Sequence, residues 1–181
     1  MQKPSLTNIE IFSAPTFSKG TALLATFTEA AVLKILSAVC DPEIPVLSIL
    51  DLGIVRGIHI NGQQVEVMIT PTYSGCPAMD MISMHIKLAL IESGYQHIKV
   101  TAVLAPAWTT EWMSDAGKEK LKAYGIAPPV FRSALEGEAT VECPQCHSSN
   151  TRLISEFGST ACKALYQCHD CKEPFDYFKC H

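Results

Sequence analysis

The sequence predicts an α/β (α+β) protein, in which a small mixed sheet of about three strands packs with about three helices and a cysteine-rich ribbon follows. Three observations support this prediction. Helix-type and strand-type patterns alternate between residues 26 and 129, the pair Asn61-Gly62 separates two strand-like runs, and six of the eight cysteines fall within residues 143–181. We therefore expect one core domain and one small domain that needs an additional source of stability.

The composition limits the classes of function. With 181 residues and 48% hydrophobic content, the chain is long enough to bury a sizeable core. Its net charge of -4 argues against a nucleic-acid surface, which normally carries a basic excess. No apolar run reaches the roughly 18 to 20 residues of a membrane span, and TALLATF near the start lacks the basic flank of a signal peptide. We expect a cytoplasmic protein that binds neither nucleic acid nor membranes.

The first elements follow an N-terminal segment, residues 1–25, that has no sustained period and is predicted to be a flexible arm. Thr28 is a candidate N-cap for the first helix. The prolines of CDPEIP are expected to stop this helix, because a residue before proline avoids the helical conformation. The apolar residues that suit its core-facing stripe are Ala31, Leu33, Ile35, Leu36 and Val39.

A β-hairpin comes next, made of the runs IVRGIHI and QQVEVMITP. Asn61-Gly62 is the strongest two-residue turn signal, and Val65, Val67 and Ile69 alternate with other residues on the return strand. The third strand is HIKVTAVL.

Two more helices complete the predicted α/β domain, which spans residues 26–129. One covers residues 77–92, with Pro77 in its first turn and Gly94 as its stop. The other is EWMSDAGKEKLKAYG, which ends at Gly125. After the paired prolines 128 and 129, residues 130–142 are predicted to be a linker or a pairing strand, and residues 143–181 a four-cysteine ribbon.

The ribbon contains two C-x-x-C pairs, CPQC and CHDC, separated by 21 residues. In a reducing compartment this spacing indicates a metal site, and four thiolates favour tetrahedral zinc, with iron or an iron–sulfur cluster as competitors. The alternative is a set of redox-active thiols. The predicted ligands are Cys143, Cys146, Cys168 and Cys171.

Three further donors of the ribbon have two interpretations. Cys162 either packs inside the ribbon or binds a second metal ion, and Cys180 and His181 are either a frayed end or further ligands of such a labile site.

The stretch TYSGCPAMD places Cys76 directly before a predicted helix. Backbone N–H groups and the helix dipole at that place favour a thiolate, so we expect a lowered thiol pKa and a reactive or metal-binding sulfur. The alternative is a small buried cysteine. No histidine is close enough in sequence to complete a Cys-His nucleophilic pair, which argues against a catalytic role.

Two other groups of residues are candidates. Asp41 and Glu43 lie among prolines at the predicted helix exit, where Asp41 caps a turn or both carboxylates form an oxygen-rich ligand or docking face near Cys76. The segment with Trp108, Thr109, Trp112 and Met113 forms either part of the core or a patch for a protein partner.

These motifs resemble a known family. DPEIPVLSILDLGIV, VEVMITPTYSGCPAMDMI and APAWTTEWMSDAGKEKLKAYGI are similar, in order and spacing, to the α/β domain of SufT/MIP-type iron–sulfur assembly proteins. With the ribbon and the terminal FDYFKCH, the whole chain resembles the PaaD-type proteins of the phenylacetyl-CoA epoxidase system. By position, Cys76 matches the family's cysteine, Asp41 and Glu43 its acidic motif, and Trp108 and Thr109 its WT segment. The family's aspartate in that segment is absent here, where Leu104 to Ala107 precede Trp108.

The resemblance implies an accessory, non-enzymatic protein that helps to mature iron–sulfur or iron centres of the epoxidase, a multicomponent monooxygenase of aerobic phenylacetate degradation. The implied partners are its iron–sulfur reductase and its oxygenase subunits. One cysteine has too few donors for a transient iron–sulfur cluster, so a homodimer or a partner's thiols would have to complete it. The alternative is a structural or adaptor subunit with a purely structural zinc ion.

Overall fold

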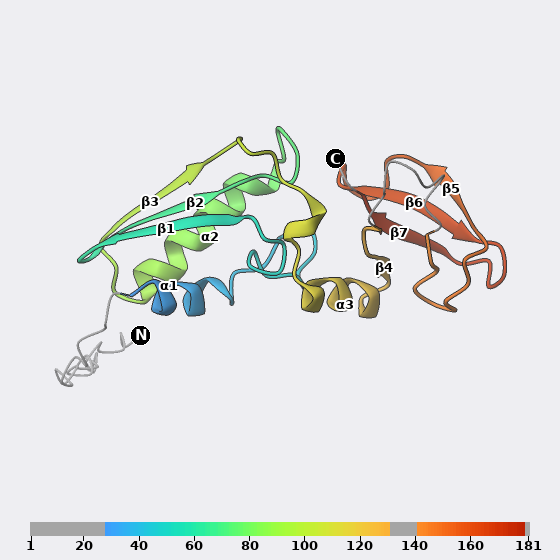
Figure 1. The fold of residues 1–181 in the computed structure, drawn as a ribbon, viewed down its shortest axis with the longest axis horizontal. Helices are drawn as coiled ribbons and strands as arrows, with labels where there is room; N and C mark the ends of the chain where they lie inside the picture. The colour runs from blue at the N-terminus through green and yellow to red at the C-terminus, as the bar shows by residue number, and fades with distance from the viewer. Residues whose placement is uncertain (1–27, 131–140, 180–181) are drawn as a thin grey trace, which may run out of the picture.

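The computed structural model describes residues 28–130 and 141–179. The predicted arm, most of the predicted linker, Cys180 and His181 lie outside the described residues. Figure 1 shows two parts along the long axis, a three-stranded sheet with its helices and a four-stranded sheet, with α3 near the junction between them. The predicted fold class is confirmed.

The first part, called the α/β part below, contains α1 (Glu29–Leu36), β1 (Val55–Asn61), β2 (Gln64–Ile69), α2 (Ala78–Glu92), β3 (His97–Ala102), the 3-10 turn η1 (Thr110–Trp112) and α3 (Asp115–Ala123). The second part, called the ribbon, contains β4 (Ile126–Ala127), β5 (Thr151–Ser155), β6 (Lys163–Cys168) and β7 (Pro174–Phe178). Within these described residues, no helix is both long enough and apolar enough to cross a membrane.

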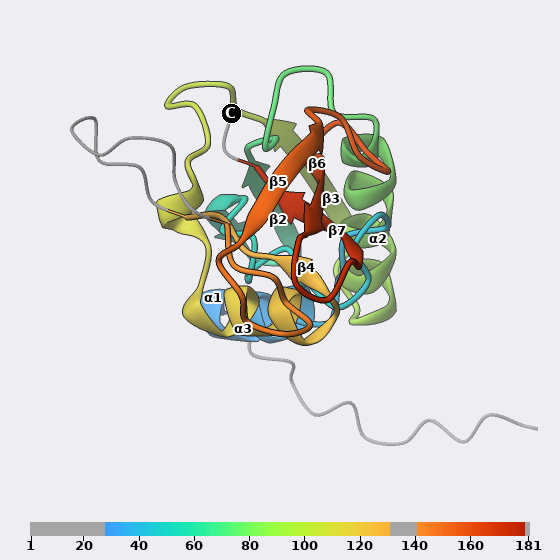
Figure 2. The ribbon, with the colours of Figure 1, turned by 90° about the vertical axis from the view of Figure 1, so that its right-hand side faces the viewer.

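The first sheet is mixed, because β2 pairs antiparallel with β1 and parallel with β3. Side chains alternate between the two faces of a strand, so Val65, Val67 and Ile69 all point to one face and are buried there. Helices α1 and α2 cover that face (Figures 1 and 2). On the other face Glu66 forms an ion pair of 2.8 Å with Lys99.

The hairpin turn lies one residue later than predicted. Asn61 pairs with Gln64, so the two turn residues are Gly62 and Gln63 rather than Asn61 and Gly62. Gly62 has a φ of 60°, the conformation that a primed hairpin turn requires at its first central position.

The first helix begins as predicted but ends earlier. The Thr28 hydroxyl accepts a hydrogen bond of 3.2 Å from the Ala31 backbone N–H, which confirms the cap. The helix ends at Leu36, before the prolines of CDPEIP. Backbone bonds explain this end, because the residues after it pair with a later segment: Ile49 N–H donates to the Val39 carbonyl.

The predicted stripe of this helix is wrong in part. Val32, which the prediction omitted, is fully buried together with Leu36, whereas Leu33 is exposed and Ala31 is only partly buried. Positions 32, 36 and 39 are spaced four and three residues apart and therefore lie on one face. Val39 is buried on that face although it lies beyond the last helical turn.

The other helix boundaries are close to the predictions. Pro77 is the N-cap of α2, and Gly94 follows its end with a φ of 95°. The third helix starts at Asp115, four residues later than expected, because the Ser114 hydroxyl caps it by accepting a bond of 2.9 Å from Gly117 N–H. Asp51 in turn accepts a hydrogen bond from the Ser114 hydroxyl.

The ribbon sheet has the strand order β4-β7-β6-β5, and β4 runs parallel to β7. Strand β4 precedes the expected boundary near residue 129, so one strand of this sheet lies on the N-terminal side of it. The exact division into domains stays a prediction. The ribbon has a small core of its own, made of Ala127, Val141, Cys143, Ala164, Cys168, Phe175 and Tyr177.

Candidate functional site

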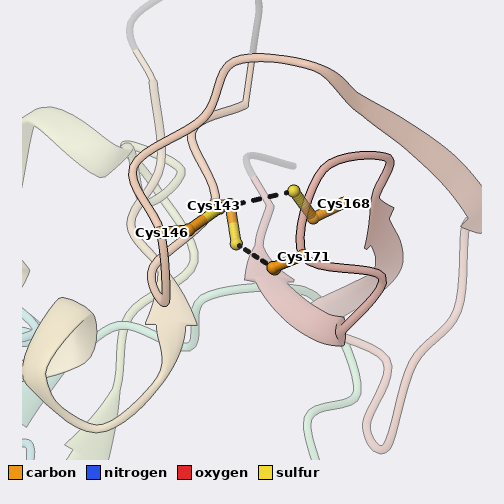
Figure 3. A group of neighbouring side chains, drawn as sticks. All are labelled: Cys143, Cys146, Cys168 and Cys171. Atoms are coloured by element: carbon orange, nitrogen blue, oxygen red, sulfur yellow. Dashed lines mark hydrogen bonds between the residues drawn. The ribbon is translucent and has the colours of Figure 1, made fainter.

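The four predicted ribbon ligands lie together. Cys143 and Cys146 come from the loop before β5, whereas Cys168 ends β6 and Cys171 lies in the turn between β6 and β7. Pairing of the strands brings these two segments face to face (Figure 3). All four sulfur atoms lie within 4.8 Å of one another. No other group of three or more such donors is this close within the described ranges.

The sulfur spacing fits a tetrahedral metal ion. Cys143 Sγ lies 3.7 Å from Cys171 Sγ, and Cys146 Sγ lies 3.6 Å from Cys168 Sγ. A tetrahedron with zinc–sulfur bonds of about 2.3 Å has sulfur–sulfur edges of about 3.8 Å. All four cysteines are free thiols rather than disulfides. These residues would hold one zinc or iron ion, and such an ion would tie together a ribbon with little core of its own.

The two metal loops have the same backbone geometry. The N–H of the first cysteine donates to the carbonyl five residues on, from Cys143 to Ser148 and from Cys168 to Glu173. The residue after each second cysteine is left-handed, with φ of 61° at His147 and 69° at Lys172. Sequence reasoning missed this conformation because neither position carries the glycine that would signal it.

Polar contacts also join the two loops. Asp170 accepts hydrogen bonds from the Ser148 hydroxyl and, at 2.9 Å, from the Asn150 side-chain amide. The Asp170 N–H in turn donates to Cys168 Sγ at 3.4 Å. Backbone N–H groups, that of Cys171 first, lower the pKa of Cys168 to about 7. The thiolate form that binds metal is thus favoured in this loop.

Cys76 lies in the turn that leads into α2. Gly75 has a φ of 82°, so the sharp turn requires a residue without a side chain. The sulfur accepts hydrogen bonds from Ala78 N–H and the Tyr73 hydroxyl. The predicted lowering of the thiol pKa is nevertheless wrong, because burial raises the pKa of Cys76, and the carboxylates of Glu43 and Asp41 add to the rise.

The two carboxylates of the acidic motif differ in what they do. Asp41 Oδ1 accepts backbone bonds of 2.7 Å from Glu43 N–H and 2.9 Å from Ile44 N–H, which is the turn-forming role. Glu43 Oε2 instead lies 3.8 Å from Cys162 Sγ. Glu43 is therefore the carboxylate that faces a thiol.

One of the two interpretations held that Cys162 packs inside the ribbon. The structure shows that it does not. It is 5% exposed and belongs to the core of the α/β part, against which Cys76 also packs. The Thr160 hydroxyl lies 3.0 Å from its sulfur. The Cys162 thiol lies at the end of the β5–β6 loop and faces the acidic motif. This contact forms because the ribbon packs against the α/β part.

The tryptophan segment forms the junction between the two parts. Trp108 is buried, donates a hydrogen bond of 2.9 Å to the Leu52 carbonyl, and meets Phe178 of the ribbon edge to face at 6.1 Å. Met113 is buried as well, and the Arg56 guanidinium covers Trp112 at 3.5 Å. Trp108 and Met113 are therefore core residues, and the prediction of a partner contact is wrong for them. Of the four candidates, only Thr109 is exposed.

The exposed apolar surface of the ribbon lies elsewhere. Most ribbon aromatics are buried, including Phe175, Tyr177 and Phe178. The outer strand β5 and the loop after it instead expose Leu153, Ile154 and Phe157.

Two protein families match the chain. The iron–sulfur cluster assembly protein family matches residues 29–103, and the PaaD zinc beta ribbon domain matches residues 127–179. The first range contains Cys76, and the second contains all four ribbon ligands and Cys162.

Individual relatives cover most of the chain or about half of it. A protein of Escherichia coli K12, provisionally named as a component of 1,2-phenylacetyl-CoA epoxidase, is 50% identical over 87% of this chain and 98% of its own length. An "Fe-S protein maturation auxiliary factor" of Porphyromonas gingivalis is 33% identical over 49% of this chain and 85% of its own length. A DUF59 crystal structure from Bacillus anthracis is 30% identical over 51% of this chain and 90% of that one, with a TM-score of 0.49.

Proposed function

Because the chain belongs to the PaaD family of 1,2-phenylacetyl-CoA epoxidase components, we propose that it serves that multicomponent monooxygenase as an accessory factor. It matures the iron–sulfur or iron centres of the iron–sulfur reductase or the oxygenase subunits, and it performs no epoxidation itself. Iron or a cluster is then its cargo, and the ribbon metal is its resident ion.

The absence of a catalytic constellation supports the accessory role. A di-iron oxygenase needs inward carboxylates and Glu-x-x-His motifs on a helical bundle. Among residues 28–130 and 141–179, the one group of three or more clustered donors consists of cysteines only. His85, the histidine nearest to Cys76 in sequence, lies about two turns into α2, so no histidine adjacent in sequence offers Cys76 a base.

The observation that carries the maturation role is the environment of Cys76. A half-buried thiol that accepts two hydrogen bonds and lies near carboxylates suits a sulfur that binds a cation and releases it again. This cysteine falls in the range that matches iron–sulfur cluster assembly proteins. The relative named as a maturation factor aligns with 49% of this chain, which adds to this support.

The test is reconstitution of a metal-free client with this protein as the donor, without oxygen. We expect Cys76→Ala to deliver much less iron and sulfide to the iron–sulfur reductase than the wild type does. Cys40→Ala is the matched control, because Cys40 is also a partly buried free thiol, and its sulfur contacts the Ala38 carbonyl although the residue directly precedes Asp41. Undiminished cluster content with Cys76→Ala would overturn the proposal.

One observation favours the second candidate, an adaptor subunit with a structural zinc ion. Leu153, Ile154 and Phe157 are each 47% exposed or more on the outer strand of the ribbon and its loop, where a partner would cover them. An adaptor predicts stable association with the oxygenase and no change in client metal content when this protein is deleted. A maturation factor predicts transient association and a client that lacks its centre.

A further inference from the structure

Three donor groups that are far apart in sequence meet where the two parts join. Glu43 follows α1, Cys76 precedes α2, and Cys162 precedes β6. The Glu43 carboxylate acts electrostatically on both thiols, and it lies 3.8 Å from Cys162 Sγ. The Tyr73 hydroxyl forms a hydrogen bond with Cys76. Besides burial, the charges of Glu43 and Cys162 also act on Tyr73 and raise its pKa. These groups therefore face one small region.

The Cys162 thiol donates a long hydrogen bond to Glu43 Oε2, and the distance between these two atoms is also one that two ligands of a single ion can have. Bonds of about 2.3 Å to sulfur and about 2.1 Å to oxygen, at the tetrahedral angle, place the two atoms about 3.6 Å apart. The observed 3.8 Å is close to this value. Within the described residues, no lysine, arginine or histidine forms an ion pair with Glu43. Lys163, whose ammonium acts electrostatically on Cys162, forms an ion pair of 3.7 Å with Asp176 and not with Glu43.

We propose that Glu43, Cys76 and Cys162 form a composite site for one divalent transition-metal ion, Fe(II) or Zn(II), with one thiolate from each part of the molecule. This inference rests on the proposed function for the role of Cys76, and it adds the second sulfur and the carboxylate. Two thiolates and one carboxylate select soft or borderline ions over Mg²⁺ and Ca²⁺.

The site is open until a metal binds. The three donors do not all lie within 4.8 Å of one another, so Cys76 approaches the other two when the ion arrives. The turn that leads to Cys76 borders a cavity of about 200 Å³ lined by residues such as Thr72, Tyr73 and Ser74. Gly75, which has no side chain, lets the backbone beside Cys76 adopt conformations that other residues disfavour.

The donor count matches a site that transfers its metal. Binding releases the protons of both thiols, and the cation relieves the repulsion among two thiolates and the neighbouring carboxylates. Three protein ligands leave one position of a tetrahedral ion for a client thiolate. The four-sulfur ribbon site has no such open position.

The test uses the full chain with zinc in its ribbon, titrated with Co(II) without oxygen. We expect one Co(II) to bind beyond the zinc, with a thiolate-to-cobalt charge-transfer band. Cys162→Ser should reduce this band by about half or more, since one of two thiolates is removed. Cys40→Ser should leave the band unchanged. A full band in Cys162→Ser would overturn the proposal.

Cys162 is buried, so zinc content is measured in parallel to show that the Cys162→Ser ribbon is intact. X-ray absorption at the cobalt edge of the wild type decides the matter without any variant: two sulfur ligands per cobalt support the composite site, and one or none overturns it. Glu43→Gln should keep the band but weaken cobalt binding. The result is independent of client reconstitution, where indifference to Cys76→Ala would instead overturn the proposed function.

Discussion

The two cysteine groups of this chain differ in how far they are assembled before metal binds. In the ribbon, two loops of the same backbone geometry hold four sulfurs within 4.8 Å, and hydrogen bonds to Asp170 fix one loop against the other. At the junction, Cys76 and Cys162 come from different parts and burial raises the pKa of both. Glu43 lies 3.8 Å from Cys162, but the three donors are not all within 4.8 Å of one another. A preassembled group retains an ion, whereas an open group takes one up and releases it.

The largest expected effect comes from removing a ribbon ligand. Cys143→Ser should lose the ribbon zinc and unfold residues 141–179, because the binding free energy of a structural zinc, about 10–16 kcal/mol, is also folding free energy in a domain of this size. Zinc analysis with amide hydrogen exchange measures both. The α/β part, which has its own core, should keep its protection from exchange.

Slow amide exchange in the ribbon after a chelator had removed its metal would contradict the role given to the ion. The small core of the ribbon, and not the ion, would then hold it together. Cys40→Ser is the control and should change neither zinc content nor exchange.

A smaller effect is expected at the junction. Trp108→Ala removes the hydrogen bond to Leu52 and the ring contact with Phe178, and replacing a buried tryptophan by alanine costs about 3–5 kcal/mol. Chemical denaturation measures the loss in the free energy of unfolding. Thr109→Ala, at the exposed neighbour, should change it by less than about 0.5 kcal/mol. Equal effects of the two substitutions would contradict the packing at the junction.

Asp51 stabilises the α/β part without touching either cysteine group. Burial by itself would raise the pKa of Asp51. Hydrogen bonds from Lys120, Ser48 and Ser114 outweigh this effect and lower the pKa to about 2. A lowered carboxyl pKa stabilises the fold above the unfolded value of 3.8 and loses this effect as the pH falls through about 2. Asp51→Asn should therefore cost about 2 kcal/mol at pH 7.

Denaturation at several pH values tests this prediction. The difference between Asp51→Asn and the wild type should shrink between about pH 4 and pH 2. At about pH 7 the two proteins should have the same zinc content. A difference that is constant across this range would mean that shape rather than charge causes it.

The smallest effect on stability is expected on the outer strand of the ribbon. Leu153 is 47% exposed, so Leu153→Ser should change the free energy of unfolding by less than about 0.5 kcal/mol. If the ribbon docks clients, the same variant should bind the reductase or the oxygenase more weakly, as measured by calorimetry. Unchanged binding to both would remove this surface from the docking site.

Local signals in the sequence predicted the fold well. The Thr28 cap, the alternation on β2 and the glycine after α2 were confirmed, because each depends on a few neighbouring residues. The early end of α1 was missed because the carbonyl of Val39 bonds to the distant Ile49.

The candidate site residues also differ in whether local sequence signals or long-range contacts place them. The spacing of the C-x-x-C pairs identified four cysteines that the structure does bring together. The approach of Cys162 to Glu43 depends on how the ribbon docks, across 119 residues of sequence, and no local pattern encodes it. The pKa of Cys76 was mispredicted because its burial outweighs the favourable helix start.

The most direct test of the central claim, that one cysteine group retains metal while the other carries it, is metal and sulfide analysis of protein purified without oxygen. The wild type is compared with Cys76→Ala and Cys143→Ser. We predict that zinc is lost only in Cys143→Ser, and that iron or acid-labile sulfide is lost in Cys76→Ala while its zinc remains. Zinc alone in the wild type, at a level indifferent to Cys76, would contradict the account.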